Sequence, residues 1–157
     1  MKNLFSIFII SMAYMIQVNA QIVINEYSAA NYDTHADNYT AATQKYNDWL
    51  ELFNPTAVPI DISGWYLTDK PTNPTKWIIP SSFVVPANGF VVIYCSGRDE
   101  VNGGYAHANF KITQTKGNEV LMLSNQAMIF QDSISVLPNQ ASHTRGRETD
   151  GAANWSV

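Results

Sequence analysis

The amino-acid sequence predicts an all-β fold, either an antiparallel β-sandwich or a barrel. Short apolar and β-branched runs recur along the chain, at a spacing of roughly 8–12 residues that is typical of such folds. Turn residues, chiefly Pro, Gly, Asn and Asp, separate most of these runs. No stretch of the sequence has the i, i+3, i+4, i+7 apolar spacing of an amphipathic helix.

The first three strands are predicted from β-branched and aromatic runs. Residues 22–28 form the first strand, and residues 48–53 form the second. Between them, residues 29–47 make a polar loop that is long for a compact domain, and such loops are usually functional or flexible. A proline-bounded turn leads into a third strand, residues 60–67. Gly64 inside this strand predicts a bulge or the close approach of another backbone.

Later runs predict further short strands, and the last two of these form a hairpin. Residues 97–109 read as a second polar loop, and the segment after Pro138 also reads as a loop. The predicted strands are 77–79, 83–85, 90–95, 110–112, 119–124 and 128–136.

The N-terminus reads as a secretory signal peptide, residues 1–20. Lys2 gives a positive start, a short apolar stretch follows, and the small-x-small pattern at Ala20 predicts cleavage there. This leaves residues 21–157 as one domain, exported from the cell, with no second stretch long enough to span a membrane. The apolar ending at Val157 suggests an interrupted strand of a longer polypeptide.

Charge and cysteine content narrow the function classes. The chain has a formal net charge of −4, and its nine basic residues are scattered, so nucleic-acid binding is disfavoured. Cys95, the single cysteine, lies in an apolar run. A reactive or bridging thiol is one interpretation, but the sequence favours a small buried side chain.

One set of motifs resembles the lamin-tail domain family. The residues that match, in order and spacing, include Asn25-Glu26, Asp48-Trp49, Glu51-Leu52, Asn54-Pro55, Asp61, Ser63-Gly64-Trp65, Leu67 and Asp69. The resemblance implies an immunoglobulin-like antiparallel β-sandwich in which Asp48, Trp49, Glu51, Asn54, Gly64, Trp65 and Asp69 are structural motif residues. It also implies a non-catalytic binding or attachment module at the cell surface or outside the cell.

Glu51 is the one motif residue whose environment depends on which face of its strand points inward. Strict alternation places it on the same face as Trp49 and Phe53, opposite Leu50 and Leu52. If the Trp49 face is inward, Glu51 is partly buried and must be paired. Candidate partners by charge are Arg145 and Arg147. A structural role for Glu51 is the preferred interpretation.

Carboxylates near the first long loop suggest a calcium site. The candidate ligands are Glu26, Asp33, Asp37 and Asp48, since Ca²⁺ takes six to eight oxygen ligands. Their spacing is not that of a dedicated calcium loop. A solvated loop stabilised by Asx-turns explains the same residues, and the sequence favours that interpretation, with no cofactor required.

Aromatic side chains in the loops are the candidate ligand-binding residues. Tyr32, Tyr39 and Tyr46 share the first long loop, and Tyr105 lies in the second. Exposed tyrosines can stack on sugars or fill partner pockets. The alternative, that these rings fold back to cover the end of the sandwich, stays open.

Catalytic residues are not assigned. His35, His107 and His143 lie in polar segments, are spaced too widely for a zinc site, and are expected to be solvent-exposed. The sequence has neither a Gly-x-Ser-x-Gly elbow nor a Gly-rich phosphate loop.

The predicted function is therefore a non-catalytic binding module or scaffold. Its expected partner is a protein or a cell-surface polysaccharide, held by the loops 29–47 and 97–109, since loops on rigid scaffolds carry function. One alternative is an accessory domain of a longer exported hydrolase, a nuclease or phosphoesterase. The other is a carbohydrate-binding module, which requires exposed loop tyrosines.

Overall fold

The computed structural model describes residues 22–37 and 46–156. These residues form thirteen β-strands and no helix, which confirms the all-β prediction. Since the described part of the chain is without helices, it has none that could cross a membrane. The predicted signal peptide, residues 1–20, lies outside the described residues and stays a prediction.

The larger sheet has seven strands. They are β1 Val23–Ser28, β2 Trp49–Asn54, β7 Gly89–Tyr94, β8 Glu100–Asn102, β9 Tyr105–His107, β12 Arg145–Arg147 and β13 Trp155–Ser156. Their order is β13-β12-β1-β2-β7-β9-β8. Neighbours pair antiparallel, except that β7 and β9 run parallel. Parallel neighbours need a crossover, and the chain makes it through β8.

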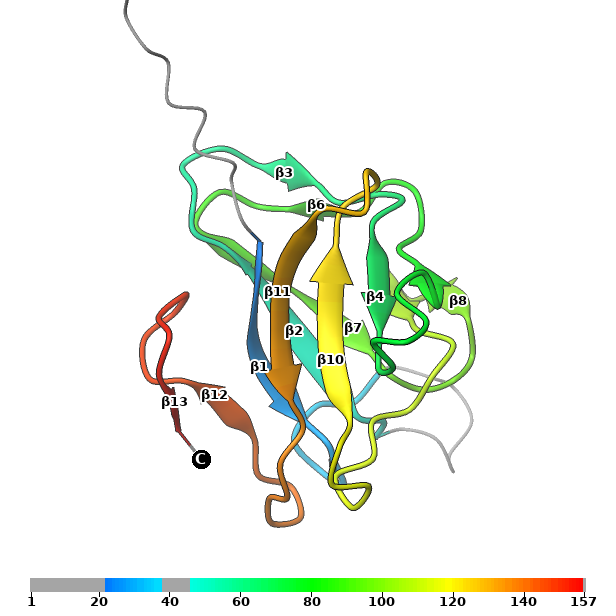
Figure 1. Ribbon diagram of the computed structural model, residues 1–157, viewed down its shortest axis with the longest axis vertical. Helices are drawn as coiled ribbons and strands as arrows, with labels where there is room; N and C mark the ends of the chain where they lie inside the picture. Colours follow the sequence, from blue (N-terminus) through cyan, green and yellow to red (C-terminus); the bar gives the residue numbers. More distant parts are fainter. Residues whose placement is uncertain (1–21, 38–45, 157) are drawn as a thin grey trace, which may run out of the picture.

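The smaller sheets complete the sandwich. Four strands, β4 Tyr66–Thr68, β5 Trp77–Ile78, β10 Val120–Ser124 and β11 Phe130–Ser135, pair in the order β11-β10-β4-β5. A separate two-stranded sheet joins β3 Ile60–Asp61 to β6 Val84–Val85. Figure 1 shows β4, β10 and β11 lying in front of β1, β2 and β7, so the two larger sheets form the two layers.

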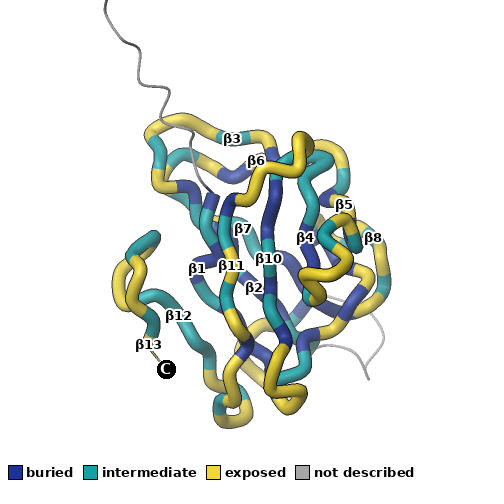
Figure 2. Tube along the Cα trace, viewed as in Figure 1, coloured by how far each residue is buried: buried dark blue, intermediate teal, exposed yellow. Residues whose placement is uncertain are grey.

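The hydrophobic core fills the space between these layers. Leu50 and Leu52 point into it from β2, and Leu67, Leu121 and Leu123 point into it from the four-stranded sheet; all five are fully buried. Burying each such side chain contributes roughly 1.5–3 kcal/mol. In Figure 2, dark buried positions recur along β1, β4 and β10, while most turns are exposed. The leucine face of β2, not the face that carries Glu51, therefore points inward.

Residues 60–67 form two strands rather than the predicted one. β3 ends at Asp61 and β4 begins at Tyr66, with Gly64 between them at a φ of +74°. A residue with a Cβ is strained in this left-handed conformation, so glycine fits the turn. Gly64 makes a turn beneath the side chain of Gln126 instead of a bulge. The other predicted alternative, the close approach of another backbone, is met by the carbonyl of Ile79, which accepts the Gly64 amide at 2.9 Å.

Three other predictions about strands and loops are wrong. Residues 97–109 contain the β8–β9 hairpin, which turns at Gly103 and Gly104. Residues 110–112 form no strand, although Phe110 and Ile112 are buried in the core. The polar segment after Pro138 contains β12 and β13. Backbone pairing along a sheet edge does not require apolar side chains, which explains both unpredicted pairs of strands.

The end of the sandwich at the bottom of Figure 1 gathers several connections. β1 and β7 end there and β2 begins there, because β2 pairs antiparallel with both. β4 ends and β10 begins at the same end. We call this the lower end of the sandwich. It is made by residues 29–37, 46–48, 69–76 and 111–119.

Candidate functional site

A recess of about 240 Å³ lies at the lower end, beside the start of β2. It is polar and open, with Cys95 at one side and two tyrosines among its lining residues. The residues that line it are Ala29, Ala30, Asn31, Tyr32, Tyr46, Asn47, Asp48, Cys95 and Lys111. We call this the tyrosine recess. It brings together residues from the first long loop, the end of β7 and the segment before β10.

Asn31 fixes the wall of the tyrosine recess. Its side chain is buried and donates to the carbonyl oxygens of His35 (2.8 Å) and Asn47 (2.9 Å). Its Oδ1 accepts from the amide and the hydroxyl of Thr34, at 3.1 and 2.7 Å. This is the Asx-turn behaviour typical of Asn in loops. The described part of the loop is therefore held by a built hydrogen-bond network.

A second network ties this loop to the neighbouring strands. The Arg98 guanidinium lies 2.7 Å from the Asp37 carboxylate and 2.9 Å from Nδ1 of His107. Asn47 donates to the same Asp37 carboxylate. The Tyr94 hydroxyl donates to the carbonyl of Ala36 at 2.8 Å. Loop residues on both sides of residues 38–45 are thus bonded to the large sheet or to each other.

His107 is fully buried within this network, so the prediction that it is solvent-exposed is wrong. Burial, and then the adjacent Arg98 charge, lowers the pKa of its imidazole. A guanidinium can only donate hydrogen bonds, so Nδ1 accepts and the proton of the neutral ring lies on Nε2. The ring also stacks on Tyr94, with centroids 5.3 Å apart. His35 and His143 are exposed, as the sequence predicts.

The four candidate tyrosines are separated by the structure. Tyr32 is 67% exposed and Tyr46 is 37% exposed, and both line the recess. Tyr105 lies elsewhere, on β9, where its ring meets Tyr94 edge-on at 5.3 Å. Tyr39 lies outside the described residues. Two of the four rings therefore line one recess.

The candidate calcium ligands occupy different environments. Asp37 is paired with Arg98, and Asp48 accepts a hydrogen bond from the amide of Asn31 at 3.3 Å. Glu26 lies on β1 opposite Glu51, and Asp33 is exposed. Among residues 22–37 and 46–156, no group of three or more His, Cys, Asp or Glu could hold a metal ion. A calcium site stays a prediction.

Burial alters the chemistry of two groups in the recess. Desolvation raises the pKa of Asp48 to about 6, although the Asn31 amide and the Lys111 charge act in the opposite direction. The Cys95 thiol is buried, and burial raises its pKa well above the usual range. A thiol is a poor nucleophile when its pKa is raised, so the buried interpretation of Cys95 holds.

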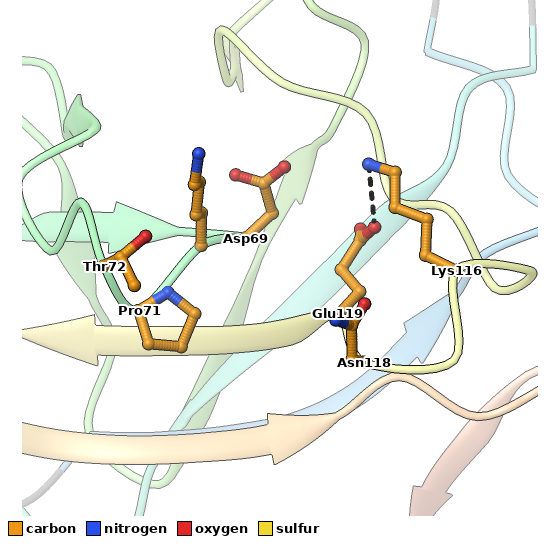
Figure 3. A pocket seen from close by; sticks show the side chains of 7 residues that line it. Asp69, Pro71, Thr72, Lys116, Asn118 and Glu119 are labelled. Carbon is orange, nitrogen blue, oxygen red and sulfur yellow. Dashed lines mark ion pairs between the residues drawn. The ribbon is translucent and has the colours of Figure 1, made fainter.

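A larger cavity, of about 420 Å³, lies near the recess. Figure 3 shows Asp69, Pro71 and Thr72 on one side of it, and Lys116, Asn118 and Glu119 on the other. Lys70 completes the lining. We call this the lysine cavity. The cavity is lined by residues 69–72 and 116–119 and the recess by residues 29–32, 46–48, 95 and 111, so both hollows lie at the lower end of the sandwich.

A comparison with protein families identifies the chain. A family model of the Lamin Tail Domain matches residues 16–141, which is more than half of the sequence. The chain belongs to the lamin tail domain family. A search of curated proteins finds no match. The matched range includes both hollows and every strand from β1 to β11, while β12 and β13 lie beyond it.

The structure shows what several lamin-tail motif residues do. Asn54 is fully buried and donates to the carbonyl oxygens of Val58 and Val85, while its Oδ1 accepts from Thr56. It thereby closes the turn after β2 and ties that turn to β6. Asp69 pairs with Lys76. Both residues therefore make contacts within the fold.

The two aromatic motif residues are packing residues. Trp49 is 2% exposed and its ring lies 4.8 Å from the ring of His35. Trp65 is partly buried against the core.

Glu51 has a different partner from the two arginines named by charge. Its Oε1 accepts a hydrogen bond of 3.1 Å from Nδ2 of Asn25, and the same nitrogen donates to Asp150. Burial raises the pKa of Glu51, which the Asn25 hydrogen bond opposes. Asn25 and Glu51 are both lamin-tail motif positions, so the motif here connects β1, β2 and the turn before β13.

Arg147 and Asp132 form a further connection that sequence reasoning missed. The Arg147 guanidinium lies 2.6 Å from the Asp132 carboxylate, which also accepts the Ile24 amide at 2.8 Å. Nε of Arg147 donates to the carbonyl of Ile24. The contact joins β11 of one layer to β1 and β12 of the other. No local sequence pattern indicates a pair that only the tertiary fold brings together.

Proposed function

We propose that this lamin-tail domain is an exported, non-catalytic binding module that acts at the cell surface or outside the cell. It holds its partner, a protein or a cell-surface polysaccharide, at the lower end of the sandwich. Export rests on the N-terminal sequence, where a positive start, an apolar stretch and a small-residue cleavage pattern precede residue 21.

The observation that carries the proposal is the tyrosine recess. Two exposed aromatic rings, Tyr32 and Tyr46, border a polar hollow whose wall Asn31 holds in place. Aromatic side chains with polar neighbours are the residues that dominate binding energy at recognition sites. A wall held in place loses little conformational entropy on binding. The one thiol, Cys95, is buried and has a raised pKa, which makes it a poor nucleophile.

Binding to cell-envelope material tests this function. The purified protein is expected to bind envelope preparations, and Tyr32→Ala is expected to weaken that binding at least fivefold. The matched control is Val58→Ala, because Val58 is 60% exposed in the turn after β2, away from the lower end. Equal binding by both variants would contradict the assignment of the recess. N-terminal sequencing of the exported protein should begin at Gln21.

A carbohydrate partner is favoured by one particular observation. Tyr32 offers a ring that is 67% exposed, beside the amide and carboxylate groups of Asn47 and Asp48. Stacking surfaces next to hydrogen-bonding groups suit sugar rings, which have apolar faces and hydroxyl edges. A glycan array with no bound sugar would remove this candidate and leave a protein partner.

A further inference from the structure

We propose that the lysine cavity and the tyrosine recess together bind an acidic polysaccharide, in which carboxylate-bearing sugars contact Lys70 and Lys111. The inference rests on the proposed function and specifies its ligand. It adds a second hollow, the lysine cavity, to the recess that carries the binding proposal.

The first observation is where the lysines are. All four lysines of the described residues lie at the lower end: Lys70, Lys76, Lys111 and Lys116. Lys70 and Lys116 line the cavity, Lys111 lines the recess, and Lys76 pairs with Asp69 in the cavity wall. The whole chain has a net charge of −4, so this clustering goes against its overall charge.

Two of the four lysines are already neutralised. Lys76 pairs with Asp69 at 2.5 Å, and Lys116 pairs with Glu119 at 3.2 Å. The Asp69 and Glu119 side chains are only 8% and 2% exposed. Glu119 also accepts the Thr113 amide at 2.8 Å. Each of these buried carboxylates is already paired with a lysine, Lys76 or Lys116, so neither is left to compete with an incoming anion for Lys70.

The other two lysines are available to a ligand. Lys70 and Lys111 are exposed, and neither forms an ion pair with another residue in the described part of the chain. Around the cavity, three ammonium groups (Lys70, Lys76 and Lys116) face two carboxylates. A carboxylate ligand would restore the balance, and cation–carboxylate hydrogen bonds are among the stronger polar contacts.

The two hollows are joined by one segment of the chain. Lys111 lines the recess, and two residues later the amide of Thr113 donates to the Glu119 carboxylate of the cavity at 2.8 Å. The lining also contains uncharged polar groups for sugar hydroxyls, namely Thr72 and Asn118, and the exposed ring of Tyr32 for a sugar face. An acidic peptide would satisfy the lysines but would leave this stacking surface unused.

Binding of polygalacturonate, compared with its fully methyl-esterified form, tests the inference. The two polymers share a backbone and differ in the carboxylate charge. The purified protein, in buffer with EDTA, is expected to bind the acidic form at least tenfold more tightly, and rising salt should weaken that binding. Poly-glutamate serves as the peptide probe and is expected to bind at least tenfold more weakly than polygalacturonate.

Substitutions then locate the site. The double variant Lys70→Gln, Lys111→Gln is expected to lose about tenfold in affinity for polygalacturonate, since two exposed ion pairs are lost. The matched control is Arg145→Gln, which removes one positive charge outside both hollows and whose guanidinium contacts the carbonyl of Pro138. Circular dichroism confirms that each variant is folded.

Each outcome decides the inference. Equal binding of the acidic and esterified polymers would overturn the acidic ligand while leaving a sugar-binding function in place. Equal binding of poly-glutamate would overturn the polysaccharide. An equal loss in Arg145→Gln would overturn the site. Absence of binding to every polymer would overturn the inference. If the protein then still bound the protein fraction of the envelope, that result would support the proposed function with a protein partner.

Discussion

Removing the mostly buried Asp132 carboxylate is expected to destabilise the domain strongly. Asp132 accepts two hydrogen bonds that come from the opposite layer of the sandwich, from the Ile24 amide (2.8 Å) and the Arg147 guanidinium (2.6 Å). In Asp132→Ala both donors lose this acceptor. Arg147 keeps its contacts with the carbonyl oxygens of Ile24 and Ala152.

The expected magnitude follows from burial. The Arg147 and Asp132 side chains are 8% and 15% exposed, so the guanidinium that remains has limited access to water. Breaking a buried ion pair by removing one partner costs roughly 3–5 kcal/mol. Partial exposure of Asp132 places the expected cost near the lower limit, at about 3 kcal/mol. For a domain of this size such a loss lowers Tm by about 10 °C.

Thermal unfolding followed by near-ultraviolet circular dichroism measures this loss. The control is Glu148→Ala. Glu148 is exposed, follows Arg147 on the β12–β13 hairpin, and its carboxylate forms no ion pair with the described residues. That control should shift Tm by only about 1–2 °C, as neutral surface changes do. A similar small shift in Asp132→Ala would refute the idea that this contact joins the layers. Asp132→Asn, which keeps an acceptor for Ile24, should fall between the two.

Four further outcomes are expected. Asp48→Asn should raise Tm at pH 8, and this advantage should disappear as the pH falls to 4. The pKa of Asp48 in the folded protein, about 6, lies above the ordinary 3.8, so the stability that this carboxyl contributes is present at low pH and lost as the pH rises through 6. A difference in Tm that stays constant with pH would contradict this reasoning. Glu51→Ala should cost about 1 kcal/mol, as Asn25 loses one acceptor; an unchanged Tm would count against its structural role. Gly64→Ala should lower the free energy of unfolding by about 1–2 kcal/mol because φ is +74°. Adding Gln126→Ala, which removes the side chain nearest to the new methyl group, should not restore this stability. Full restoration would show that the cost comes from a clash with Gln126 and not from the backbone conformation. Calcium and EDTA should leave Tm unchanged, and a rise with calcium would revive the site of Glu26, Asp33, Asp37 and Asp48.

The sequence predicted the strands whose pattern is set by the core. In β2 the inward leucines, Leu50 and Leu52, alternate with Trp49 and Glu51, and this alternation is visible without a structure. The hairpin of β10 and β11 was predicted for the same reason and is confirmed. Burial imposes a period on the sequence, so strands that face the core can be found from the sequence alone.

The strands that were missed pair through their backbones at the sheet edges. β8 is partly polar, and β12 is the tripeptide Arg145-Gly146-Arg147, so neither has an apolar period. Their partners, β9 and β1, are fixed by the completed fold. The parallel pairing of β7 with β9 is likewise a long-range result that no local pattern carries.

Only the part of the candidate site that lies in one continuous segment was predicted from the sequence. Composition marked residues 29–47 as a functional loop and identified Tyr32 and Tyr46, which the structure places in one recess. The lysine cavity was missed because its lysines come from segments far apart in the sequence and meet only when β4 and β10 pair. Scattered charge in a sequence therefore does not exclude a charged surface in the fold.

The loop at the tyrosine recess is held in a defined shape by hydrogen bonds. A recognition loop gains affinity when its bound shape exists before binding. Here Asn31 bonds two parts of the loop to each other, and Asp37 pairs with Arg98, which in turn contacts the neutral ring of His107 on β9. That connection requires His107 to stay uncharged beside a guanidinium. Burial and Arg98 lower the pKa of His107, which favours the neutral ring in this connection. Acidification that protonates the ring is expected to weaken the attachment of the loop, because the imidazolium would then face the Arg98 guanidinium.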